Sequence, residues 1–113
     1  MGLNVFADLP TAPLAAERVD ALLCRPGLRV ERIVSTGQAS PPGFWYDQAE
    51  HEWVLLLQGE ARLTLDTPAG LREVQLAAGD WLELPAHCRH RVEATQAEPP
   101  TVWLALFWPA GDA

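Results

Sequence analysis

Residues 51–66, HEWVLLLQGEARLTLD, hold two apolar segments that are joined by a single glycine, Gly59. The four residues 54–57 form a continuous apolar run, which is typical of a strand buried on both faces. After Gly59 the pattern alternates, with Ala61, Leu63 and Leu65 separated by polar residues, as in a strand buried on one face. This stretch therefore predicts two consecutive β-strands.

The first of these strands begins with His51 and Glu52, two residues that disfavour burial. Glu52 lies either at a solvated strand end, paired with an arginine, or in a cavity that holds a positive charge. His51 has the opposite parity along the strand, so we do not expect it to share a site with Glu52.

Further strand patterns follow at regular spacing, separated by turn residues such as SPPG (40–43), TPAG (67–70) and AGD (78–80). The predicted strands cover residues 28–36, 52–58, 60–66, 71–77, 81–85, 90–95 and 101–108. Many short strands with this punctuation indicate an all-β fold, an antiparallel barrel or sandwich. No internal repeat is visible.

The N-terminal part has a different character. Residues 1–13 contain several proline and alanine residues and are expected to be irregular, and residues 14–25 are predicted to form a short helix that Pro26 and Gly27 end. We therefore expect an N-terminal segment, residues 1–27, followed by one β-domain, residues 28–113.

Composition excludes several classes of function. The formal net charge is −7 and all eight cationic residues are arginines, so we expect no nucleic-acid partner, no lysine Schiff base and no Walker-type phosphate loop. No apolar run is long enough to span a bilayer, and the first residues do not resemble a signal peptide. A cytoplasmic protein is the expectation. Cys24 and Cys88 do not suggest a secreted disulfide framework.

Two motifs resemble those of the cupins, a family of small jelly-roll barrels. The first motif of the family ends in Glu, six residues and Gly, which matches Glu52-WVLLLQ-Gly59; the second matches Gly79-DWLEL-Pro85-AHCR-His90, with His87 at a position where glycine is usual. The resemblance covers residues 28–108. It implies an antiparallel jelly-roll β-barrel, and a divalent metal ion held by Glu52 and His90.

The chain departs from the family where two further histidines are usual before the glutamate. Counting back from Glu52 gives Gln48 and Tyr46 with the shorter spacing, or Asp47 and Trp45 with the longer one. The Gln48 carbonyl or the Asp47 carboxylate is then the candidate replacement ligand. Trp45 and Tyr46 are expected to line the mouth of the cavity.

His90 and His87 differ in how they could reach the candidate metal ion. In residues 90–95, His90 shares its parity with the apolar Val92 and Ala94, so it points inward, as a metal ligand or as a hydrogen-bonded core histidine. His87 lies in a loop three residues earlier and either reaches the same metal or is simply exposed. Mixed nitrogen and oxygen ligands suit Zn, Fe, Ni or Mn.

Five tryptophans and the apolar segment VWLALFW (102–108) exceed what one small core readily hides, which favours a homodimer. The leading hypothesis is a metal-binding cupin with a cavity for a small organic molecule. Whether it is an enzyme is left open, since this fold hosts many chemistries. The alternative is a metal-free module that binds or senses a small molecule, which the missing histidine pair favours.

Overall fold

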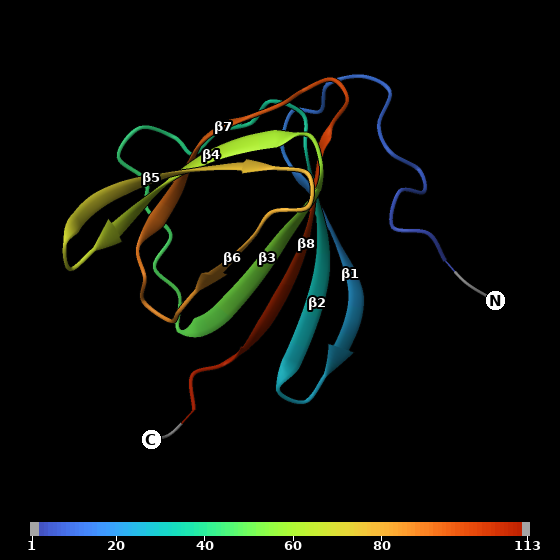
Figure 1. Ribbon diagram of the computed structural model, residues 1–113. Helices are drawn as coiled ribbons and strands as arrows, with labels where there is room; N and C mark the ends of the chain where they lie inside the picture. The colour runs from blue at the N-terminus through green and yellow to red at the C-terminus, as the bar shows by residue number, and fades with distance from the viewer. Residues whose placement is uncertain (1–2, 112–113) are drawn as a thin grey trace.

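The computed structural model describes residues 3–111, and these form eight β-strands (Figure 1). The strands are β1 (Arg18–Arg25), β2 (Leu28–Ser35), β3 (Glu50–Gln58), β4 (Glu60–Thr67), β5 (Gly70–Ala77), β6 (Trp81–Leu84), β7 (His90–Thr95) and β8 (Thr101–Pro109). The seven strands predicted from the sequence are present. Within residues 3–111 there is no helix of the length and apolarity that crossing a membrane requires.

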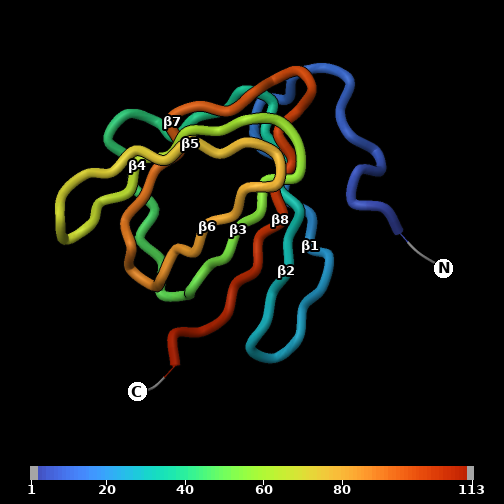
Figure 2. The backbone as a smooth tube through the Cα atoms, in the orientation of Figure 1, coloured from blue at the N-terminus to red at the C-terminus, as the bar shows by residue number. Residues whose placement is uncertain are grey.

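The strands form two antiparallel sheets that pack face to face. One sheet has the order β1-β2-β8-β3-β6, and the other has the order β5-β4-β7. In Figure 2 the two layers lie one above the other. No ladder joins them within the described residues, so the closed barrel expected from the sequence is wrong in that respect: this is a two-layered, open β-fold. A sheet that splits in this way buries one face of each half against the other.

The chain changes sheet at Gly59, between β3 and β4. Gly59 has φ +90°, and a Cβ atom at this position would lie 2.8 Å from the Cα of Thr101. Only a residue without a side chain combines this backbone angle with this close approach. The glycine between the two apolar segments therefore marks the corner at which the two sheets diverge, as the paths of β3 and β4 show (Figure 1).

The predicted helix at residues 14–25 is wrong, because most of this segment is strand β1, which pairs with β2. The register shifts between Ala21 and Leu23, so Leu22 is the extra residue of a β-bulge. A bulge inserts one residue into the two-residue period of a strand, and it produced the three- and four-residue spacings that resembled a helix. Pro26 and Gly27, with φ +76° at the glycine, form the tight turn of a hairpin.

The hydrophobic core lies between the sheets. It includes Leu56 of β3, Leu63 of β4 and Leu84 of β6, each almost fully buried, together with Trp103 and Phe107 of β8. The alternation in β4 is confirmed, since Ala61, Leu63 and Leu65 all point inward.

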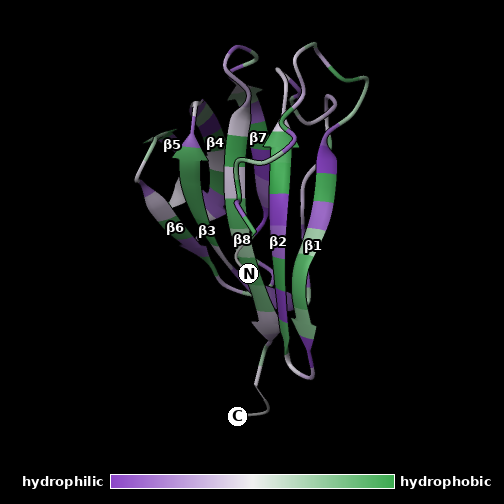
Figure 3. Cartoon of the chain, turned by 90° about the vertical axis from the view of Figure 1, so that its right-hand side faces the viewer, coloured by the Kyte–Doolittle hydropathy of each residue, from purple (hydrophilic) through white to green (hydrophobic). Residues whose placement is uncertain are grey.

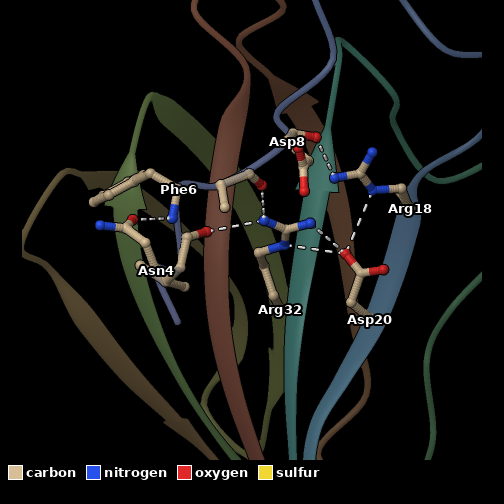
Figure 4. Close-up of polar contacts among 8 residues, drawn as sticks. Asn4, Phe6, Asp8, Arg18, Asp20 and Arg32 are labelled. Atoms are coloured by element: carbon tan, nitrogen blue, oxygen red, sulfur yellow. Dashed lines mark hydrogen bonds and ion pairs between the residues drawn. The ribbon is translucent and has the colours of Figure 1, made fainter. Parts of the chain in front are cut away.

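The N-terminal segment crosses the outer face of the five-stranded sheet, which Figure 3 views with β4 and β7 behind it. Arg32 of β2 holds it there: Nη1 donates to the carbonyl oxygens of Val5 and Ala7, at 3.0 and 2.6 Å, and Nη2 donates to Asp20 at 2.6 Å (Figure 4). The Arg18 guanidinium adds a bond to the carbonyl of Asp8. A buried arginine thus ties an irregular segment to a strand.

Candidate functional site

A cavity of about 280 Å³ lies between the two sheets. Its apolar wall comes from both sheets and includes Val54, Leu63, Leu84, Trp103 and Phe107. Its polar wall consists of Glu17, Arg29, Glu31, Tyr46, Gln48, Glu52 and His90. A concave, mostly apolar site with a few converging polar groups is typical of small-molecule binding.

The segment before β3 and the start of β7 bring four of these polar residues together. Tyr46 and His90 form an isolated β-bridge, in which each backbone N–H donates to the other's carbonyl, at 2.7 and 3.1 Å. Their rings are stacked, with centroids 5.2 Å apart. The backbone of Gln48 is held in place because its backbone carbonyl oxygen accepts a hydrogen bond from the backbone N–H of His87, at 2.7 Å. Glu52 faces them from β3.

Glu52 is buried and accepts one hydrogen bond, from Nε2 of Gln48 to its Oε1 at 3.1 Å. Burial raises the pKa of this carboxyl from its ordinary 4.5 to about 7, and the bond from Gln48 opposes the shift only in part. The charge of Glu31 raises the pKa further, whereas Arg29 lowers it. Glu52 is therefore poised to take up or release a proton near neutral pH.

His90 has a defined tautomer. Its Nδ1 lies 2.9 Å from the carbonyl oxygen of Cys88, and since a carbonyl only accepts, Nδ1 carries the proton. Burial lowers the pKa of the imidazole, which favours the neutral ring. Nε2 then presents a lone pair 3.9 Å from Oε1 of Glu52. This separation exceeds a hydrogen bond.

Arg29, Glu31 and Glu17 are site residues that the sequence reasoning missed. Arg29 donates from Nε to Glu31 at 3.1 Å and from Nη1 to Glu50 at 2.9 Å. Glu17 accepts a bond from Ser35, which in turn accepts one from the indole of Trp103 at 3.1 Å. Arg29 and Glu31 share one parity in β2, but apolar residues occur on both parities of this strand, so the pattern alone did not indicate the inner face.

Asp47 and His87, predicted from the sequence as further candidate ligands, do not line the cavity. Their side chains contact each other, with Oδ1 of Asp47 2.8 Å from Nδ1 of His87. The Asp47 side chain is 49% exposed and the His87 side chain is 70% exposed. Adjacent residues of an extended segment point to opposite sides, so Tyr46 and Gln48 face inward while Asp47 faces outward. His87 adopts the left-handed conformation, with φ +62°.

Trp45 also does not line the cavity, for the same reason of alternation. Its ring lies beneath the guanidinium groups of Arg89 and Arg91, at 5.1 and 6.0 Å from the centroid. His51 lies on the outer side of β3, where its Nδ1 accepts a bond from the backbone of Ala86 at 2.9 Å. Of the residues predicted for the site, the structure thus brings together Tyr46, Gln48, Glu52 and His90.

Comparison with known proteins gives a consistent assignment. The family model described as "Cupin domain" matches residues 31–107. A protein of Ralstonia eutropha JMP134, provisionally named mannose-6-phosphate isomerase, is 47% identical, with a TM-score of 0.88 over 97% of this chain and 99% of its own.

Two more distant structures share the fold. A cupin superfamily protein of Desulfitobacterium hafniense DCB-2 is 21% identical, with a TM-score of 0.74 over 95% of this chain and 90% of its own. The cobalt(II) form of HppE, in complex with substrate, is 17% identical, with a TM-score of 0.63 over 80% of this chain and 51% of its own. No curated protein matches the chain.

Proposed function

Since this chain belongs to the cupin family, we propose that it binds a small organic molecule between its two sheets, beside a divalent metal ion held by Gln48, Glu52 and His90. The ion would be Zn, Fe, Ni or Mn, decided by availability rather than affinity. The observation that carries the proposal is the pair formed by Glu52 and His90, whose polar atoms face each other across the cavity without a hydrogen bond.

The residues present fit a metal ion. Nε2 of His90 and Oε1 of Glu52 are 3.9 Å apart. Two ligands of one metal ion, each at about 2.1 Å, lie about 3.0–3.4 Å apart in octahedral or tetrahedral geometry, so a small movement of these side chains toward each other would let both bind one ion. The Gln48 amide, which lies 3.1 Å from Glu52, adds an oxygen donor once it turns. This set differs by one amide from the facial triad of two histidines and one carboxylate.

The side chains also have roles of their own. His90 offers an unprotonated nitrogen, and Glu52 holds or releases a proton near pH 7, so the pair can move a proton on a bound molecule. The cavity volume limits that molecule to a small metabolite. A bound metal would supply Lewis-acid activation of an oxygen atom.

Metal analysis tests the proposal. Protein grown and dialysed with each of the four ions is examined by elemental analysis, with His90→Ala and Glu52→Gln as site variants. His51→Ala serves as the control, because His51 lies on the outer side of the same strand. We expect about one ion per chain in the wild type and the control, and none in the site variants. Wild-type protein that stays free of all four ions contradicts the proposal.

A metal-free binding module is the second candidate. Among residues 3–111 no group of three His, Cys, Asp or Glu side chains is placed to hold a metal, and Gln48 donates its amide to Glu52. An organic ligand that co-purifies with metal-free protein would favour this function. The cavity of this chain carries three carboxylates against one arginine. Such a wall does not favour a sugar phosphate like the one in the name of the Ralstonia eutropha relative.

We also propose that the chain forms a homodimer through the part of the outer face of the five-stranded sheet around Trp81, beside the region that the N-terminal segment crosses. On this face Leu104 of β8 pairs with Leu55 of β3, and Leu55 pairs in turn with Trp81 of β6. Trp81 is 62% exposed, so this row of apolar residues ends in a large group open to a partner. Sedimentation tests this: Trp81→Glu should give a monomer, whereas Leu71→Glu, on the exposed part of β5, should not change the mass. A monomeric wild type contradicts it.

A further inference from the structure

The polar wall of the cavity is acidic. Glu17, Glu31 and Glu52 line it, and among residues 3–111 Arg29 is the one cationic side chain that does. Three carboxyl groups against one guanidinium give this wall an excess of acidic side chains.

Arg29 is already occupied by carboxylates. Its Nε and Nη1 donate to Glu31 and Glu50, and its guanidinium carbon lies 4.2 Å from the centroid of the Phe107 ring. A phosphate group that entered the cavity would meet a guanidinium whose charge two carboxylates already balance, together with the negative field of those carboxylates. Arg29 therefore makes a weak anion site.

The cavity wall also offers a hydrogen-bond acceptor on His90. The His90 side chain is 95% buried, since 5% of it is exposed. Its Nδ1–H donates a hydrogen bond to the carbonyl oxygen of Cys88, and within the described residues no donor is bonded to Nε2. In protein that holds no metal ion, this nitrogen is free to accept a hydrogen bond from a ligand. The Trp103 indole donor, in contrast, is taken by Ser35.

We propose that the organic ligand of this cavity is a small ammonium compound, bound through its N–H donors by the Glu17 and Glu31 carboxylates, and that phosphate esters are disfavoured. The inference rests on the proposed function, because it takes the cavity between the sheets as the binding site. It goes further in naming the charge and the hydrogen-bonding character of the molecule. Four observations support it: the three carboxylates, the occupied arginine, the buried acceptor and the mostly apolar wall.

A matched series of probes tests the charge. n-Butylammonium, 1-butanol and n-butyl phosphate share one apolar chain and differ in their head group. Binding to metal-free protein is followed by the NMR signal of the Trp103 indole N–H, which is assigned by its loss in Trp103→Phe. We expect butylammonium to bind about tenfold or more tightly than butyl phosphate, the factor that corresponds to about 1.4 kcal/mol.

Two variants locate the preference. Glu31→Gln removes one carboxylate and frees Nε of Arg29, so affinity for butylammonium should fall and affinity for butyl phosphate should rise. Glu17→Gln should lower the affinity for butylammonium and leave the affinity for butyl phosphate unchanged. Glu83→Gln is the matched control, because Glu83 is exposed on β6, at the other edge of the same sheet, and does not line the cavity. Its affinities should equal those of the wild type.

Each outcome decides the inference. Butyl phosphate that binds as tightly as butylammonium overturns it, and so does a Trp103 signal that butylammonium does not shift. The same samples are analysed for metal, so the two proposals fail separately. A preference for the amine in protein that never binds metal contradicts the metal site alone, and a metal-binding protein without the preference contradicts the ligand class alone.

Discussion

His90 and Glu52 face each other across 3.9 Å from strands of different sheets, His90 from β7 and Glu52 from β3. The two sheets meet through apolar side chains over most of the core, so the pair belongs to a polar patch in a largely apolar interior. Buried polar groups without mutual bonds cost free energy of folding. Pairs of this kind are typical of functional sites, which agrees with the binding role proposed for this one.

Glu52 should make stability fall as the pH rises. Its pKa is about 7 in the folded protein and near 4.5 when exposed. Below pH 4.5 the carboxyl is protonated in both states; between pH 4.5 and 7 only the unfolded chain loses the proton, which favours unfolding, by about 3 kcal/mol in total at 1.36 kcal/mol per pH unit. Glu52→Gln should remove this dependence.

Urea unfolding of metal-free protein at pH 4, 6 and 8 measures the effect. The variant and the wild type should differ little at pH 4, and the variant should be the more stable at pH 8. A difference between the two proteins that stays constant with pH would contradict the raised pKa.

Gly59→Ala should be severely destabilising. The new Cβ would lie 2.7 Å from Oγ1 of Thr101 and 2.8 Å from its Cα, at a backbone φ of +90°. Backbone strain and overpacking together predict a loss of about 2–6 kcal/mol of unfolding free energy. Gly79→Ala is the matched control: φ is +94° there, but no atom lies within 4 Å. Equal losses in the two variants would show that the contact with Thr101 is unimportant.

His87→Ala should be less stable than His87→Gly by about 1 kcal/mol, because alanine keeps a side chain in the left-handed conformation and glycine does not. Both variants lose the exposed contact with Asp47, so that contact cancels in the comparison. Thermal and urea unfolding give the difference. If the alanine variant is the more stable, the left-handed conformation at residue 87 is not under strain.

Arg32→Met should release the N-terminal segment while the sheets stay folded. The carbonyl oxygens of Val5 and Ala7 and the carboxylate of Asp20 all lose their donor. Hydrogen exchange should therefore accelerate in residues 4–8 and remain slow in β2 and β8. Arg25→Met is the control, since Arg25 is exposed and donates only to the carbonyl of its neighbour Cys24. Unchanged exchange in residues 4–8 would contradict the role of Arg32.

Most of the strands and the inward orientation of His90 were predictable because their signals are local. Alternation in residues 60–66 and 90–95 reflects the pleat of a strand, and it turned Leu63 and His90 inward as predicted. Residues 14–25 misled because a bulge at Leu22 imitates helical spacing. Arg29 and Glu31 were missed because β2 carries apolar residues on both faces, one covering the cavity and the other under the N-terminal segment. Such assignments depend on what packs against a strand, which a sequence does not state.

β3 and β4 extend away from the corner at Gly59, so the angle at this corner affects the distance between their far ends. Glu52 lies seven residues before this corner, and Leu65, the partner of His90, lies six residues after it. At about 3.4 Å per residue these two stretches are about 20–24 Å long. A change of about 5° in the angle at the corner thus moves the ends by about 2 Å relative to each other, as stretches of that length require. The spacing between the Glu52 carboxylate and the His90 imidazole therefore depends in part on the corner at Gly59, where a Cβ atom would collide with Thr101.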